Sequence, residues 1–355
     1  MLTKFTQILI FGLSAFFVSF VLYPRYIKLL KKRKAGQSIR DTARSGGEAS
    51  IFKELHKHKA GTPTMGGGMF LFVTGLMVVI SIRLQSEWYI NNSLFNRQET
   101  YVLLFALFSM GWLWLVDDIL NIRGKSEIKW LSAKLKLLWM FLFSGFISRW
   151  FYAKLGVSDV DLRPLAREVN IGIAYPIITF FLTISITNAI NIADGLDGLV
   201  WGLMLLVLMA LGIMTFVASQ FLATTLIAIV IWCLLAFLRY NINPAKVFMW
   251  DAGALGLWGF TATLVYLLDI NSTVSLGVVI PFAIMFLIFW LEIASSAIQM
   301  FWKKIFKKKL FLIAPFHHLL EKKGMAEHTI VMRLWLIQWV LIAIGLMMLF
   351  YQLQV

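Results

Sequence analysis

Acidic side chains stand where long apolar runs of this chain end. Asp117 and Asp118 directly follow one such run. Two adjacent carboxylates at a membrane boundary are costly unless they are hydrated, paired or bound to a metal ion. Neighbours on a helix point about 100° apart. One of the pair could therefore bind a cation while the other faces a substrate, and a hydrated helix end is the alternative interpretation.

The segment 188–199 reads Asn-Ala-Ile-Asn-Ile-Ala-Asp-Gly-Leu-Asp-Gly-Leu. Its polar side chains recur at every third position: Asn188, Asn191, Asp194 and Asp197. On a helical turn this spacing puts them roughly on one face. Gly195 and Gly198 break the helix and let the backbone approach a ligand. Two amides and two carboxylates between two apolar runs have no packing role, so we predict a ligand-binding segment here.

Two later segments combine aromatic, acidic and imidazole groups. Asp251 opens an apolar run, where it is either a helix cap or part of a metal shell. Phe248 could stack on a nucleobase or pack in the membrane interface. His317 and His318 lie between a basic run and Glu321, which suggests phosphate contact or proton handling. A loop histidine pair without such a role remains the alternative.

Lysines and one intramembrane acid complete the candidate set. Lys59 precedes a segment rich in Gly and Thr that includes Thr64, and it supplies a point charge for phosphate. Lys125 follows the acidic pair in a basic loop, and Glu292 lies inside an apolar run, where a carboxylate is functional or paired by default. Carboxylates, a hard cation such as Mg²⁺ and cationic phosphate clamps are what phosphoryl transfer needs.

The elements that must position these groups are membrane helices. Of 355 residues 60% are hydrophobic and only 14% are charged, with a mean hydropathy of +0.80, whereas a soluble domain is about a quarter charged. Apolar runs of about membrane length recur, and they predict an all-α bundle of about ten transmembrane helices in one domain, 1–355. The predicted spans are 5–23, 65–82, 101–116, 134–152, 171–190, 198–217, 221–239, 254–269, 274–298 and 331–351.

Basic residues fix the predicted orientation. The net charge is +15, and 26 of the 33 Lys and Arg residues fall in alternate loops, 24–64, 117–136, 239–253 and 299–333. The positive-inside rule makes these loops cytoplasmic and both termini extracytoplasmic. We read the charge as topology and attraction to the lipid bilayer, not as a sign of nucleic acid binding. The polar segments above then share the cytoplasmic side.

Five ordered segments resemble one family. They are H-x-x-K-x-G-T-P-T-M-G-G at 56–67, Asp117-Asp118, N-A-x-N-x-x-D-G-L-D-G-L at 188–199, P-A-K-V-F-M-x-D at 244–251 and A-P-x-H-H-x-x-E-x-x-G at 314–324. The chain resembles the polyprenyl-phosphate N-acetylhexosamine-1-phosphate transferases, and within them the phospho-N-acetylmuramoyl-pentapeptide transferases. The segments run in family order over nearly the whole chain.

The resemblance implies a reaction and a location. UDP-MurNAc-pentapeptide and undecaprenyl phosphate would give lipid I and UMP with Mg²⁺, on the cytoplasmic side of a bacterial inner membrane. Asp251 would bind magnesium, and Asp117 and Asp118 would serve the metal and the lipid phosphate. By the same resemblance the substrate-binding residues are Lys59, Thr64, Lys125, Asn188, Asn191, Asp194, Asp197, Asn241 and Phe248, and the catalytic set includes His317 and His318. The resemblance leaves open whether the chain forms a homodimer.

Departures from the family pattern keep other readings open. Trp250 stands where the family usually has Gly, Ala254 where it has Ser, Asn121 where it has Lys, and Leu319 where it has a third His. One alternative is a transferase that uses UDP-GlcNAc for another surface polymer. A transporter would instead predict polar residues near the midplane of the spans. The departures also favour, as a third alternative, an inactive scaffold.

Overall fold

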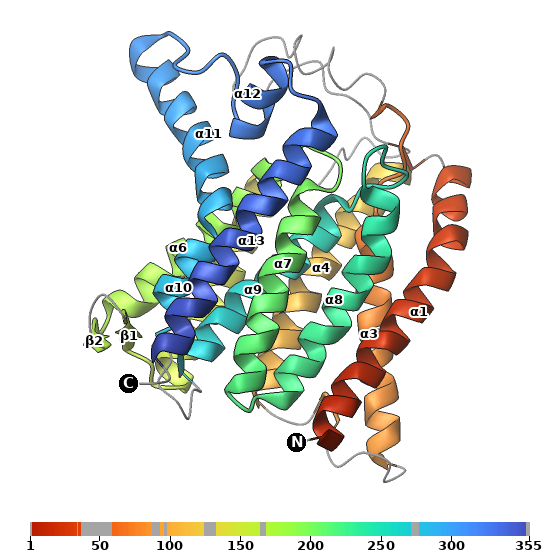
Figure 1. Cartoon of the computed structure of the whole chain (residues 1–355), viewed down its shortest axis with the longest axis vertical. Helices are drawn as coiled ribbons and strands as arrows, with labels where there is room; N and C mark the ends of the chain where they lie inside the picture. Colours follow the sequence, from red (N-terminus) through yellow and green to blue (C-terminus); the bar gives the residue numbers. More distant parts are fainter. Residues whose placement is uncertain are drawn as a thin grey trace.

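The fold is an all-α membrane bundle with one small β-hairpin, seen in a computed structural model (Figure 1). The structure describes residues 2–33, 35–36, 59–86, 93–95, 98–123, 133–163, 168–270 and 277–352. Its elements are α1 (Leu2–Lys32), α3 (Gly66–Ser86), α4 (Gln98–Arg123), α5 (Ala133–Arg149), the π-helical turn η2 (Trp150–Lys154), β1 (Asp159–Asp161), β2 (Glu168–Asn170), α6 (Ala174–Ala193), α7 (Leu199–Val217), α8 (Phe221–Asn241), α9 (Trp250–Ile270), α10 (Val279–Met285), α11 (Leu287–Phe306), α12 (Phe316–Lys322) and α13 (Glu327–Gln352).

Several helices are long and apolar enough to cross a bilayer. Within the described ranges these are α1, α3, α7, α8 and α13, and α10 with α11 makes a sixth if the bent pair is one span. Shorter apolar stretches lie in α4, α6 and α9. A helix suits this composition because it satisfies its own backbone groups where no water is present. The multi-pass bundle is confirmed, while the count of ten and the sidedness of the termini stay predictions.

Several helices differ from the predicted spans in where they end or bend. α1 was expected to stop near residue 23 but continues through Pro24 to Lys32. α4 and α9 extend beyond the predicted 101–116 and 254–269, because charged residues that end an apolar window can still be helical. The predicted span 274–298 is not one straight helix, because α10 and α11 meet at Phe286 at an angle of 68°.

The helices that carry the acidic segments pack through glycine. A Cβ on Gly256 of α9 would lie 2.9 Å from the Leu107 carbonyl oxygen of α4, and one on Gly259 would lie 2.9 Å from that of Ala106. Small residues let membrane helices approach at backbone distance. Higher numbers on α9 meet lower numbers on α4, so the two helices are antiparallel. The end of α4 therefore lies beside the beginning of α9.

Polar contacts fasten α13 along its length. Gln338 donates from Nε2 to the Met285 carbonyl at 2.7 Å, which joins the middle of α13 to α10. Gln352 accepts at Oε1 from the Gly277 amide at 2.9 Å and donates from Nε2 to the Arg163 carbonyl at 3.0 Å. The far end of α13 is thus tied to the segment before α10 and to the turn of the β-hairpin.

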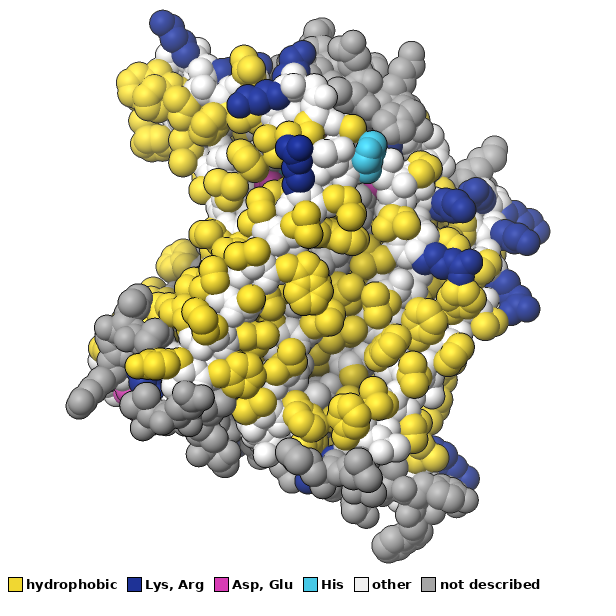
Figure 2. Space-filling view, viewed as in Figure 1, with side chains coloured by type: hydrophobic (Ala, Val, Ile, Leu, Met, Phe, Trp, Pro, Cys, Tyr) yellow, Lys and Arg dark blue, Asp and Glu magenta, His cyan; other side chains and the backbone are white. Residues whose placement is uncertain are grey.

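The two chain ends lie at the same end of the bundle, opposite α12, but well apart from each other (Figure 1). On the face shown in Figure 2, apolar side chains cover the middle of the molecule, and most described Lys and Arg side chains gather toward the α12 end. This distribution is the one that a bilayer requires. The β-hairpin, which sequence reasoning did not predict, pairs Asp159 with Asn170 and lies at the end away from α12.

Candidate active site

Main-chain hydrogen bonds join the Lys59 segment to the Phe248 segment. The Phe248 amide donates to the Pro63 carbonyl at 2.8 Å, and the Gly66 amide donates back to the Phe248 carbonyl at 2.8 Å. A Cβ on Gly66 would meet the Phe248 carbonyl oxygen at 3.0 Å and the Phe237 ring more closely. The absence of a side chain at Gly66 therefore allows the close approach of two segments that lie far apart in sequence.

The turn between α6 and α7 is locked to the end of α8. α6 ends at Ala193, and Gly198 adopts a left-handed φ of 77° just before α7. The Gly198 amide donates to Oδ1 of Asn241 at 3.1 Å, and Nδ2 of Asn241 donates to the Val247 carbonyl at 3.0 Å. Asn241 is only 2% exposed. It holds the 194–198 turn and the 241–248 loop in one arrangement.

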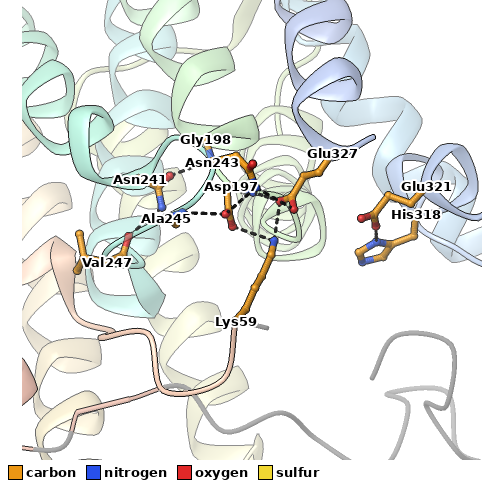
Figure 3. Close-up of polar contacts among 10 residues, drawn as sticks. All are labelled: Lys59, Asp197, Gly198, Asn241, Asn243, Ala245, Val247, His318, Glu321 and Glu327. Carbon is orange, nitrogen blue, oxygen red and sulfur yellow. Dashed lines mark hydrogen bonds and ion pairs between the residues drawn. The ribbon is translucent and has the colours of Figure 1, made fainter. Parts of the chain in front are cut away.

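A buried ion cluster sits where these loops meet (Figure 3). Nζ of Lys59 lies 2.8 Å from Oδ1 of Asp197 and 2.6 Å from Oε1 of Glu327. Oδ2 of Asp197 accepts from the Ala245 amide at 2.9 Å and from Nδ2 of Asn243 at 3.2 Å. Lys59 and Asp197 are 7% and 3% exposed. Buried charges of this kind persist only when they are paired and hydrogen-bonded.

The predicted helical stripe at 188–199 holds only in part. Because α6 ends at Ala193, Asp194 and Asp197 lie past the helix, and they do not share one helical face with the two asparagines. Asp194 is exposed, whereas Asp197 is buried in the ion cluster. The side chains of Asn188 and Asn191 lie outside the described part of the structure. The two acids therefore have different environments three residues apart.

The histidines pack against the same turn. Nδ1 of His317 lies 3.0 Å from Oε2 of Glu292, and both side chains are fully buried. Nδ1 of His318 lies 2.6 Å from Oε2 of Glu321. A Cβ on Gly195 would lie 3.0 Å from Nε2 of His318 and closer still to Nε2 of His317. Glu292, the acid predicted inside an apolar run, is thus paired with His317, and both histidines lie against the turn at Gly195.

His317 keeps one ring nitrogen toward that turn. Within the described residues its Nε2 is buried and has no hydrogen-bond partner, whereas Nδ1 faces Glu292. A carboxylate at Nδ1 fixes the ring orientation and the tautomer. The arrangement therefore presents a fixed imidazole nitrogen beside Gly195. It can donate to an anion when it is protonated and accept a proton when it is not.

Other predicted site residues are placed less fully. Thr64 is 1% exposed and donates to the Ala35 carbonyl at 3.3 Å, and Phe248 is half-buried. Lys125 lies outside the described residues. Asp117 and Asp118 belong to the last part of α4 and Asp251 to the first turn of α9, with side chains that are not described. In the ranges that are described, no group of three His, Cys, Asp or Glu residues could hold a metal ion.

Sequence reasoning missed Glu327. It is the first residue of α13, it is 11% exposed, and it contacts Lys59, Asp197 and Asn243. An acid at the start of a helix is ordinarily explained by the helix dipole. The pattern of the chain carries no signal that would distinguish this acid from such a cap.

Comparison with known proteins gives one consistent answer. Residues 100–269 match glycosyl transferase family 4. The chain is similar to a phospho-N-acetylmuramoyl-pentapeptide-transferase of Staphylococcus haemolyticus, with 32% identity over 93% of this chain and 95% of the relative. A protein of the same name from Clostridium perfringens is 31% identical over 89% of this chain and 89% of the relative. One from Staphylococcus aureus is 31% identical over 96% of this chain and 98% of the relative.

Proposed function

The chain belongs to the phospho-N-acetylmuramoyl-pentapeptide transferase family, and from this premise we propose that it makes lipid I. An oxygen of undecaprenyl phosphate attacks the sugar-bearing phosphorus of UDP-MurNAc-pentapeptide. A new P–O bond forms, the P–O bond to the bridging oxygen breaks, and UMP leaves with that oxygen. One observation carries the proposal. Family membership over nearly the whole chain coincides with four distant motifs meeting in one cluster.

The donor's uridine end is assigned to the loops around the ion cluster. Hydrogen bonds and ion pairs connect Lys59, Asp197 and Asn241 with the main chain beside Phe248. The Phe248 ring offers a stacking face for uracil, since base stacking on aromatic rings needs no particular base edge. Exposed Asp194 borders the same turn. Connected loops of this kind pre-organise a site, which reduces the ordering cost of binding.

Magnesium is proposed for the acidic residues of α4 and α9. When bound, Mg²⁺ neutralises phosphate charge and is held by carboxylate and phosphate oxygens. The antiparallel contacts of Gly256 with Leu107 and of Gly259 with Ala106, extended residue by residue, put the main chain of Asp251 level with residues 112–114 of α4, about one helical turn before Asp117. An all-oxygen set from two adjoining helices fits this ion.

His317 is proposed to contact phosphate. Its Nδ1 faces Glu292, so that Nε2 is the atom turned to the turn at Gly195. Protonated, Nε2 donates a charge-assisted hydrogen bond to a phosphate oxygen. The lipid phosphate needs little help from a base, because the second pKa of a phosphate monoester is about 6. We therefore favour direct in-line attack over a covalent aspartyl intermediate.

The location follows from charge. We propose that the α12 end of the bundle faces the cytoplasm of a bacterial inner membrane, because basic residues concentrate in the loops assigned there. The nucleotide donor would reach the site from that side, and the lipid phosphate would reach it from the bilayer.

The test is UMP release by purified protein. With UDP-MurNAc-pentapeptide, undecaprenyl phosphate and Mg²⁺, turnover is expected, and chelation should stop it until Mg²⁺ is restored. Asp251→Ala should abolish turnover, since it removes a proposed metal ligand. Replacing the donor with UDP-GlcNAc separates the two transferase readings. UMP release from UDP-GlcNAc alone, or from neither donor, would overturn the proposal, and full turnover in Asp251→Ala would remove the metal assignment.

A further inference from the structure

Glu327 is the residue through which α13 reaches the donor-binding loops. We propose that it is a positioning residue for donor binding, which acts with Lys59 to fasten the 194–198 turn and the 241–248 loop in the arrangement that receives the nucleotide. This inference rests on the proposed function and adds a residue that the five motifs do not contain.

Both carboxylate oxygens of Glu327 are used (Figure 3). Oε1 accepts from Nζ of Lys59 and from the Asp197 amide, each at 2.6 Å. Oε2 accepts from Nδ2 of Asn243 at 3.2 Å. The three partners come from three segments, before α3, between α6 and α7, and after α8. One side chain therefore bridges three loops.

A helix-capping role does not account for this geometry. A capping acid binds the free amides of its own first turn. Every side-chain hydrogen bond that the structure gives Glu327 goes instead to another segment, and none goes to an amide of α13. The carboxylate is turned away from its own helix and into the cluster.

The cluster also changes what Lys59 can do. Its ammonium group already faces two carboxylates, and the three side chains have a formal charge of −1 when all are ionised. Asp197 is similarly committed, with Oδ1 facing Lys59 and Oδ2 accepting two hydrogen bonds. These groups hold the loops in place. Asp194 is exposed and Phe248 is half-buried, so both have surface open to a ligand, as do Asn243 and Lys246 in the same loops.

The experiment measures both substrates separately in Glu327→Ala, Glu327→Gln and Glu327→Asp. In Glu327→Ala the donor KM is expected to rise about tenfold or more, as for the loss of a charged hydrogen bond. The kcat and the KM for undecaprenyl phosphate should stay within about threefold, because the lipid phosphate is not held by these loops. In Glu327→Asp the donor KM should rise less than in Glu327→Ala, because a carboxylate remains. Glu327→Gln should lie between the two, because the side-chain NH2 of Gln would face one of the hydrogen-bond donors that Glu327 accepts from.

Asp161→Asn is the matched control. Asp161 is also a buried carboxylate paired with a cation, Arg163, but it lies in the hairpin at the other end of the bundle. It should lower thermal stability without changing either KM. An unchanged donor KM in Glu327→Ala, or equal rises in the KM of both substrates, would overturn the positioning role.

Direct binding of UMP separates this inference from the proposed function. If the wild type releases no UMP from either donor, the proposed reaction fails, yet UMP affinity can still be compared between wild type and Glu327→Ala. About tenfold weaker binding in the variant would support the positioning role on its own. Equal affinity, or no UMP binding by the wild type, would overturn it.

Discussion

Adding one methyl group at Gly195 tests the contact between the acidic turn and the histidine pair. The φ of Gly195 lies outside the left-handed range, so that Ala adds bulk without backbone strain. Its Cβ would lie 3.0 Å from Nε2 of His318 and nearer to Nε2 of His317. His317 has little room to yield, because it is fully buried and held by Glu292.

The expected cost follows from the displacement. Ordinary contact begins at about 3.4 Å, so the turn must separate by 0.4 Å from the His318 ring and by about 1 Å from the His317 ring. A misplacement of about 1 Å costs on the order of a hundredfold in rate. We therefore expect kcat to fall about tenfold or more in Gly195→Ala, measured as UMP release at saturating concentrations of both substrates. The thermal midpoint should change little by comparison.

Gly212→Ala is the control for the substitution itself. Gly212 lies in α7, and its Cβ would meet Ile227 at an ordinary 3.4 Å. This variant should keep wild-type kcat and gain slightly in stability, by up to about 1 kcal/mol from helix propensity. If Gly195→Ala retained more than half of the wild-type kcat, the histidine pair would not be fixed against the turn, and the phosphate role of His317 would lose its geometric basis.

Two further predictions concern buried charges. Lys59→Met leaves carboxylate oxygens of Asp197 and Glu327 no more than 5.4 Å apart, the sum of their distances to Nζ. Their repulsion is about 3 kcal/mol at an effective dielectric constant of about 20, and the thermal midpoint should fall by about 6 °C. In the double variant Lys59→Met, Glu327→Gln, most of the lost thermal midpoint should return, because one of the two repelling charges is removed. A midpoint unchanged by Lys59→Met would contradict the existence of the ion cluster. Burial raises the pKa of Asp161, but hydrogen bonds and charge from Arg163 outweigh it and hold the pKa below 3.8. That carboxylate therefore stabilises the fold above about pH 4 and loses this effect as pH falls through its folded pKa; thermal melts should show a smaller loss on acidification in Asp161→Asn, and equal losses would refute it.

Hydropathy predicted where the helices lie along the chain better than the residues at which they begin and end. Among the described residues, apolar runs located each long helix, because a membrane span needs about 20 apolar residues. The ends differed because helix continuation depends on local contacts that hydropathy does not contain. α1 continues past Pro24, for example, and Tyr26 donates from there to the Met65 carbonyl at 2.8 Å. The break at Phe286 likewise lies within an uninterrupted apolar run.

Motifs predicted which segments meet but not how each residue is used. Lys59, Asp197 and Asn241 were all expected to bind substrate, and they do lie in one connected network. Their commitment to one another could not be predicted from spacing. The partner that completes the network, Glu327, lies 268 positions from Lys59 along the chain. Only the folded bundle brings them together.

The three anchors of α13 give this helix a mechanical role. Glu327 is held by the loops at one end, Gln338 by the Met285 carbonyl in the middle, and Gln352 by Gly277 at the other end. A rod fixed at both membrane faces cannot tilt at one without straining the other. Displacing Glu327 with the loops would therefore strain the hydrogen bonds of Gln338 and Gln352, including the one that ties α13 to the hairpin turn at Arg163.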